Sequence, residues 1–88
     1  MIQQEIIVSN TLGIHARPAS LIAQTAGKYK AEIKLIKDGT PANAASIMNV
    51  MMLAAAYQTK VLIKAQGPEE KEAVEALTQL FNAKFYEE

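Results

Sequence analysis

One histidine stands where the chain enters a segment with helical periodicity. The stretch Gly13-Ile14-His15-Ala16-Arg17-Pro18 contains the only histidine of the chain, with an arginine two positions later. The free backbone N–H groups and the positive dipole end of a helix start bind anions such as phosphate. A histidine ring can act as a nucleophile, and the planar guanidinium of Arg17 can pair with phosphate oxygens. The residues therefore place a candidate nucleophile, His15, beside a site that can receive an oxyanion, formed by Arg17 and by the backbone amides of Ala16 and Arg17.

The same stretch also has a purely structural interpretation. Gly13 allows a tight turn before the ring, and Pro18 in the first turn helps to fix where the helix begins. A lone histidine before a helix is more often a cap or a surface residue than a nucleophile. Spacing alone therefore does not establish the chemistry.

Alternating apolar residues predict four strands. Residues 4–8, 31–37 and 60–65 show this alternation or a β-branched run. Asp38-Gly39 is a strong hairpin signal that leads into a short strand over residues 40–43. Because that strand contains a proline, which cannot donate a ladder hydrogen bond, we expect it at an edge of the sheet.

Helical spacing predicts three helices, two between these strands and one after the last strand. The first covers residues 16–26, and we expect Gly27 to cap it in the left-handed conformation. The second begins after Ser46 as N-cap and runs to about residue 57. The third begins at Gly67-Pro68-Glu69-Glu70, where the helix dipole favours the two glutamates, and it reaches Phe85.

The element order is strand, helix, strand, strand, helix, strand, helix. This order predicts an α+β fold of the open-faced β-sandwich type, with a four-stranded, mostly antiparallel sheet covered on one face by three helices. The 88 residues are too few for two independent cores, so we expect a single domain over residues 1–88.

Composition excludes several classes of function. Nine basic and nine acidic residues cancel, so no bulk field would hold the chain on nucleic acid or on an anionic membrane. With no cysteine and one histidine, a metal site is not expected. No apolar run is long enough for a membrane span and the N-terminus does not resemble a signal peptide, so we expect a cytoplasmic protein.

Two stretches resemble the signatures of a known family. Gly13-Ile14-His15-Ala16-Arg17-Pro18-Ala19-Ser20 resembles the active-site motif of HPr, the histidine-containing phosphocarrier family of the phosphoenolpyruvate-dependent phosphotransferase system. Ser46-Ile47-Met48-Asn49-Val50-Met51 resembles the second signature of that family. The length and the element order of the whole chain also match the family, so the resemblance covers essentially the entire sequence.

The resemblance implies a relay role rather than an enzymatic one. The phosphoryl group would come from phosphoenolpyruvate by way of enzyme I, rest on Nδ1 (the pros nitrogen) of His15, and pass to an enzyme II A-domain. Arg17 would stabilise the phosphoryl charge. No cofactor is implied, and we expect a monomer.

The resemblance gives Ser46 a second role besides N-capping, as a regulatory phosphorylation site for an HPr kinase/phosphorylase. A phosphate there would suit the helix dipole and would add negative charge to the surface that must meet enzyme I. The sequence departs from the common pattern at two neighbours, with Ala45 where lysine is frequent and Asn49 where glycine is frequent. Leu12 is a third departure, because the family often has a small polar residue near the phosphoryl group there.

The second helix carries more apolar residues than one buried stripe requires. The pattern is compatible with a core role for Ile47, Val50 and Leu53, and we expect Met48 and Met51 to be exposed, since flexible methionines suit a surface that fits several partners. The predicted docking residues are Ile47, Met48, Met51, Met52, Ala16 and Ser20.

Other functions stay open at this point. A nitrogen-branch carrier would use the same histidine with a different enzyme I, and a mainly regulatory relative would signal through the serine but typically lacks the histidine. A small α+β domain could instead bind a small molecule or RNA, although neutral charge and few aromatic residues give no RNA-binding surface.

Overall fold

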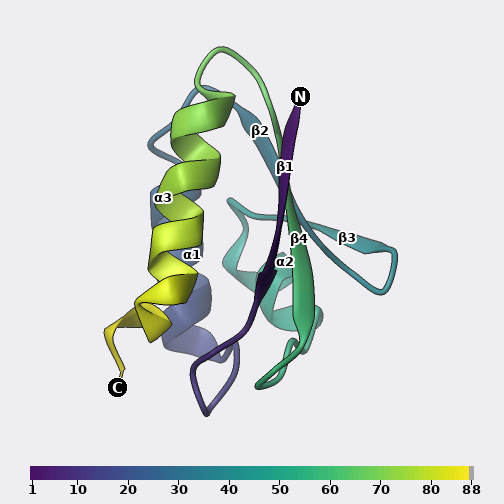
Figure 1. Ribbon diagram of the computed structural model, residues 1–88, viewed down its shortest axis with the longest axis vertical. Coiled ribbons are helices and arrows are strands. Elements are labelled where there is room, and N and C mark those ends of the chain that lie inside the picture. The colour runs from purple at the N-terminus through teal and green to yellow at the C-terminus, as the bar shows by residue number, and fades with distance from the viewer. Residues whose placement is uncertain (88) are drawn as a thin grey trace.

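Four strands form one antiparallel sheet in the computed structural model, which describes residues 1–87 (Figure 1). The strands lie in the order β1-β4-β2-β3, so the first strand of the chain is an edge strand paired with the last. Their bounds are Ile2–Ile7 for β1, Glu32–Lys37 for β2, Thr40–Asn43 for β3 and Lys60–Gln66 for β4. The strand with the proline, β3, is the other edge, as predicted.

Side chains alternate between the two faces of this sheet. Leu35 of β2 pairs with Ile63 of β4 on one side and with Ala42 of β3 on the other, and all three are buried. Their neighbours Lys34 and Lys64 pair with each other on the opposite face. One face of the sheet is therefore the floor of the core, and the other face carries polar side chains.

Three helices cover the apolar face. Their bounds are Ala16–Ala26 for α1, Ile47–Met52 for α2 and Glu70–Asn82 for α3. One continuous cluster of buried residues includes Ile22 of α1, Val50 of α2 and Leu77 of α3 together with the inward residues of the strands. The predicted open-faced β-sandwich is confirmed, and α1 and α3 run side by side over the sheet in Figure 1. No helix within residues 1–87 is long and apolar enough to cross a membrane.

The turn between β2 and β3 is the predicted two-residue hairpin. Lys37 pairs with Thr40, and Asp38 and Gly39 between them have φ angles of 50° and 79°. Positive φ at both central residues is the geometry that matches the right-handed twist of the flanking strands. The hairpin signal therefore predicted this connection correctly.

The second helix is shorter than expected and ends at Met52 rather than near residue 57. Ala54 adopts a φ of 51°, which turns the chain out of the helix. The ammonium of Lys37 donates hydrogen bonds to the carbonyls of Leu53 (3.0 Å) and Ala54 (3.2 Å). A cation at these carbonyls stabilises a helix C-terminus, so a side chain from β2 helps to fix where α2 ends.

The expectation for Gly27 was wrong. Its φ of −69° is right-handed, and its N–H group bonds to the carbonyl of Ala23, so the helix winds down without a left-handed cap. The turn continues through Lys28 and Tyr29, whose N–H groups donate to carbonyls of the last helical turn. These bonds satisfy carbonyls at the end of the helix without a left-handed glycine.

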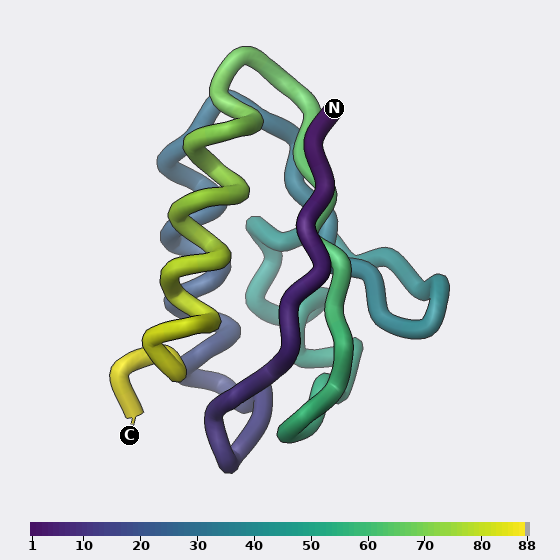
Figure 2. Tube along the Cα trace, in the orientation of Figure 1, coloured from purple at the N-terminus to yellow at the C-terminus, as the bar shows by residue number. Residues whose placement is uncertain are grey.

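The third helix ends three residues before the predicted position. α3 stops at Asn82, and a short turn, η1 (Lys84–Tyr86), follows with a left-handed backbone. Phe85 in this turn is fully buried, and its ring meets that of Phe81 edge to face at 4.8 Å. The chain therefore reverses after α3 and brings its end beside the loop that precedes α1 (Figure 2).

Candidate phosphoryl-acceptor site

His15 is the N-cap residue of α1, as the sequence predicted. The loop before it is fixed to the segment after α2, because the N–H group of Ile14 donates to the carbonyl of Ala55 at 2.9 Å. Gly13 has a φ of 72°, and a Cβ atom there would lie 2.8 Å from the oxygen of Ala55. Only glycine fits this position without displacing a neighbour, so Gly13 sets the path of the chain into His15.

The start of α1 leaves two backbone donors for a ligand. The carbonyl of His15 accepts the N–H group of Ala19 at 3.0 Å, which closes the first helical turn. Pro18 has no N–H group, and those of Ala16 and Arg17 precede the first intrahelical bond. These are the two amides that the sequence analysis selected. Arg17 is exposed, and its guanidinium forms no ion pair with another residue of the 1–87 segment.

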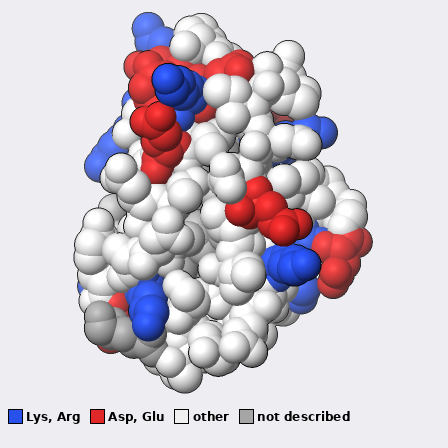
Figure 3. Space-filling view, viewed as in Figure 1, with Lys and Arg blue, Asp and Glu red and all other residues white. Residues whose placement is uncertain are grey.

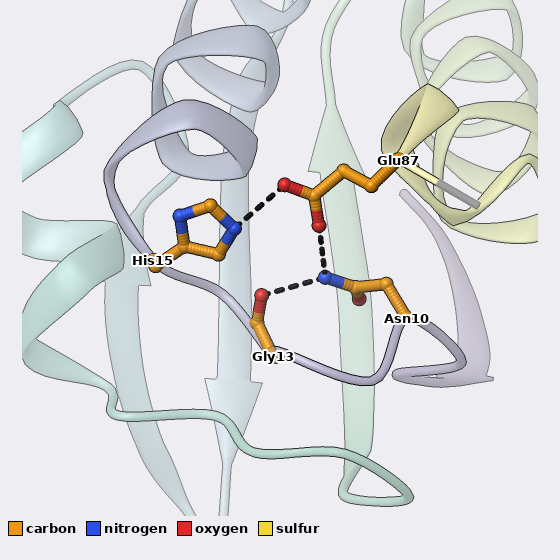
Figure 4. Close-up of polar contacts among 4 residues, drawn as sticks. All are labelled: Asn10, Gly13, His15 and Glu87. Carbon is orange, nitrogen blue, oxygen red and sulfur yellow. Dashed lines mark hydrogen bonds and ion pairs between the residues drawn. The ribbon is translucent and has the colours of Figure 1, made fainter.

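The other end of the chain supplies a contact to the ring that the sequence analysis missed. Nε2 of His15 lies 2.6 Å from Oε2 of Glu87, and 11% of the Glu87 side chain is exposed against 40% of His15. Figure 4 shows the carboxylate on one side of the ring and Nδ1 on the side away from it. Within residues 1–87, Nδ1 has no hydrogen-bond partner.

Asn10 links this carboxylate to the loop before the helix. Its fully buried side-chain amide donates to Oε1 of Glu87 at 3.0 Å and to the carbonyl of Gly13 at 2.6 Å (Figure 4). Both neighbours are acceptors, which fixes Nδ2 rather than Oδ1 as the atom that faces them. The only signal for Asn10 in the sequence is a polar turn, and nothing in the sequence marks Glu87 as a neighbour of His15.

Ser46 caps the second helix as predicted. Its hydroxyl oxygen accepts the backbone N–H group of Asn49 at 3.2 Å and the side-chain amide of Asn49 at 3.1 Å. Asn49, which departs from the family pattern, therefore adds a second donor to the same oxygen. The cap role of Ser46 follows from this geometry.

The predicted docking residues on α2 are all exposed. Met48 is 70% exposed and Met52 is 78% exposed, and α2 packs beside α1. The core role considered for Ile47 is wrong, because Ile47 is exposed, whereas Val50 and Leu53 are buried. A shallow depression on this surface is lined by Ile47, Met48, Met51 and Met52.

The two predicted docking residues on α1 differ in their exposure, and Leu12 is a third residue that the sequence singled out. Ala16 is exposed, and Ser20 is half-buried with its hydroxyl oxygen accepting a hydrogen bond from Gln24 at 3.3 Å. Leu12, in the loop before His15, is 75% exposed. The described part of the chain holds no group of three or more acidic or histidine side chains placed to bind a metal.

Fold and site together define a class of protein. A small α+β sandwich holds its only histidine at the N-cap of a helix, beside two backbone amides and an arginine that have no partner within residues 1–87, and these are the groups that a phosphoryl-accepting domain requires. The family model "PTS HPr component phosphorylation site" matches residues 2–83. The chain belongs to the HPr family, the phosphocarrier proteins of the phosphotransferase system.

Individual relatives agree with this assignment. The phosphocarrier protein HPr of Xylella fastidiosa (strain 9a5c) is 40% identical over 88 residues, which are all of this chain and 99% of that protein. The crystal structure of HPr-C-His from Thermoanaerobacter tengcongensis superposes with a TM-score of 0.96 at 42% identity and covers 100% and 99% of the two chains. The crystal structure of an HPr dimer from the same organism gives a TM-score of 0.77 at 41% identity, with coverage of 97% and 98%.

Proposed function

We propose that this chain receives a phosphoryl group on Nδ1 of His15 from phosphorylated enzyme I and passes it to an enzyme II A-domain. One observation carries the proposal: His15 is the N-cap of α1, its Nε2 contacts Glu87, and its Nδ1 is left without a partner within residues 1–87. Phosphoryl oxygens on Nδ1 can be met by the free amides of Ala16 and Arg17 and by the Arg17 guanidinium.

The neighbouring surface supports recognition by protein partners. The chain carries nine basic and nine acidic residues, and on the face drawn in Figure 3 the charged side chains lie in small groups separated by uncharged regions. A partner therefore has to recognise a local patch. The exposed apolar side chains of α2, with Ala16 and Ser20 on α1, offer such a patch beside the histidine.

The experiment that tests the proposal uses purified enzyme I and labelled phosphoenolpyruvate. We expect the wild-type chain to take up label in an acid-labile form, as for a phosphohistidine, and the His15→Ala variant to take up none. Wild-type protein that stays unlabelled, or a His15→Ala variant that labels equally well, would contradict the proposal. Repeating the assay with the enzyme I of each branch distinguishes the sugar-transporting branch from the nitrogen branch.

Regulation through Ser46 is a separate proposal. A phosphate on Ser46 would lie at the N-terminus of α2, where the dipole favours it, and next to the exposed methionines that we propose for docking. We expect an HPr kinase to add acid-stable phosphate to the wild type but not to Ser46→Ala, and we expect that phosphate to slow labelling of His15. Absence of this modification leaves the carrier role intact.

We also propose that the transferring form is a monomer acting in the cytoplasm. The depression on α2 and the face around His15 would both have to be open to a partner in turn. Light scattering of the purified chain at assay concentration, together with cell fractionation, tests these two points. A stable dimer would contradict the monomeric state. Recovery of the chain with the membrane fraction would contradict the cytoplasmic location.

A further inference from the structure

The segment that follows α3 has an unusual backbone conformation and contacts the histidine. After α3, Lys84, Phe85 and Tyr86 have φ angles of 54°, 54° and 60°, and none of them is glycine. Side chains with a Cβ rarely adopt this left-handed region, and a run of three is held only when the surrounding structure over-determines it. The strained turn is therefore a specific feature that needs a reason.

Burial of Phe85 holds this turn in place. The ring of Phe85 is fully buried against Phe81, and backbone N–H groups of Tyr86 and Glu87 donate to the carbonyls of Ala83 (3.0 Å) and Lys84 (3.1 Å). Anchored in this way, the left-handed turn points the next residue, Glu87, back at the loop before α1. The result is the 2.6 Å contact between the Glu87 carboxylate and Nε2 of His15.

Each oxygen of the Glu87 carboxylate contacts a different nitrogen. Oε2 faces Nε2 of His15, and Oε1 faces the amide of the buried Asn10. An ionised carboxylate only accepts hydrogen bonds, so this contact favours a proton on Nε2, and in the neutral ring Nδ1 then keeps its lone pair. A glutamine in place of Glu87 would offer one acceptor to two donors.

We propose that Glu87 is a positioning residue, which fixes the Nε2–H tautomer of His15 and stabilises the ring during phosphoryl transfer. This inference rests on the proposed function of His15. The lone pair of Nδ1 forms the bond to phosphorus, the bond between phosphorus and the donor breaks, and its electron pair stays with the donor. The His15 ring, now substituted at Nδ1 and still protonated at Nε2, carries a positive charge that lies beside the Glu87 carboxylate. A carboxylate plays the corresponding role for the histidine of serine proteases.

A first experiment measures the tautomer without any phosphoryl donor. The ¹⁵N chemical shifts of the His15 ring are recorded at a pH where the ring is neutral, in the full-length wild type, Glu87→Ala and Glu87→Gln. Glu75→Ala is the matched control, since Glu75 is an exposed acidic residue of α3 and its removal changes the charge equally. We expect a predominantly Nε2–H ring in the wild type and in Glu75→Ala, and a mixture of tautomers in Glu87→Ala, with Glu87→Gln in between.

A second experiment measures acceptance of phosphoryl from enzyme I as a function of carrier concentration. In metal enzymes, loss of a carboxylate that orients a metal-bound histidine typically costs about 10–100-fold in activity, and we take that range as the scale for His15. We expect a fall of about that size in the maximal rate for Glu87→Ala, with the half-saturating concentration unchanged, because Glu87 acts on the ring and not on docking. Thermal unfolding of each variant verifies that the protein is folded at the assay temperature.

The two measurements separate the two proposals. A wild type that accepts no phosphoryl defeats the proposed function, while the ring shifts still report on Glu87. Equal tautomer populations and equal maximal rates in Glu87→Ala and Glu75→Ala would overturn the inference. A rise in the half-saturating concentration at unchanged maximal rate would also overturn it, because Glu87 would then serve docking.

Discussion

Substitution of Gly13 by alanine tests how the structure holds the histidine. A left-handed residue with a Cβ costs about 1–2 kcal/mol relative to glycine. The added atom would lie 2.8 Å from the oxygen of Ala55 and 3.1 Å from Cα of Ala56, and such overpacking costs typically about 1–3 kcal/mol. Lower entropy of the unfolded chain offsets about 0.5–1 kcal/mol. The expected net loss in the free energy of unfolding is about 1–4 kcal/mol.

A matched control separates the clash from the backbone effect. Gly39 has a φ of 79°, but no atom lies within 4 Å of the Cβ that an alanine would add. Gly39→Ala should therefore cost only about 0–1.5 kcal/mol, which is the left-handed penalty less the entropy term. For a domain of this size, about 1 kcal/mol corresponds to roughly 4–8 °C in Tm.

Urea and thermal unfolding followed by circular dichroism give both values. We expect Gly13→Ala to lower Tm by several degrees more than Gly39→Ala, and to slow labelling of His15 at a temperature where both variants are folded. Equal destabilisation of the two variants would refute the reasoning, because it would show that the approach of Gly13 to Ala55 does not constrain the loop.

Three further substitutions test local features. Ser46→Ala should lower the free energy of unfolding by about 1 kcal/mol in urea titration, because the Asn49 N–H group loses its acceptor; an unchanged midpoint would contradict the cap. Ala54→Gly should raise it by about 0.5–1 kcal/mol, since glycine relieves the left-handed strain after α2, and a loss of stability would contradict that. The N–H group of Gly67, and then the N-terminal ammonium, lower the pKa of Glu70 below 4.5. The ionised carboxylate therefore stabilises the folded state fully above pH 4.5, and this stabilisation is lost as the pH falls through the lower pKa of the folded state. The stability difference between wild type and Glu70→Gln should therefore shrink below about pH 4.5, and a difference that stays constant in acid would contradict the shift.

Local patterns predicted the parts of the site that are close in sequence. The motif around His15 gave the start of α1 and its two free amides, Asp38-Gly39 gave the hairpin, and Ser46 gave the second cap. Each of these features depends on a side chain or a φ angle within a few residues, which is the range over which caps and turns act.

Contacts between distant segments could not be predicted in the same way. Glu87 and Asn10 lie 77 positions apart, and their meeting depends on a left-handed turn at residues that have no intrinsic preference for it. The end of α2 likewise depends on Lys37, 16 positions before Leu53. The burial of Phe85 and the hydrogen bond from Lys37 to Leu53 both depend on tertiary packing, which overrides local propensity.

The central claim is that His15 carries a phosphoryl group between two proteins, and a pulse–chase measurement tests it most directly. Labelled phosphoryl is first placed on the chain with enzyme I and phosphoenolpyruvate, the labelled chain is isolated, and it is then mixed with an enzyme II A-domain. The account predicts that label leaves His15 and appears on the A-domain, and that adding enzyme I and pyruvate instead returns it to phosphoenolpyruvate. Label that is released only as inorganic phosphate, or that persists in His15→Ala, would contradict the account.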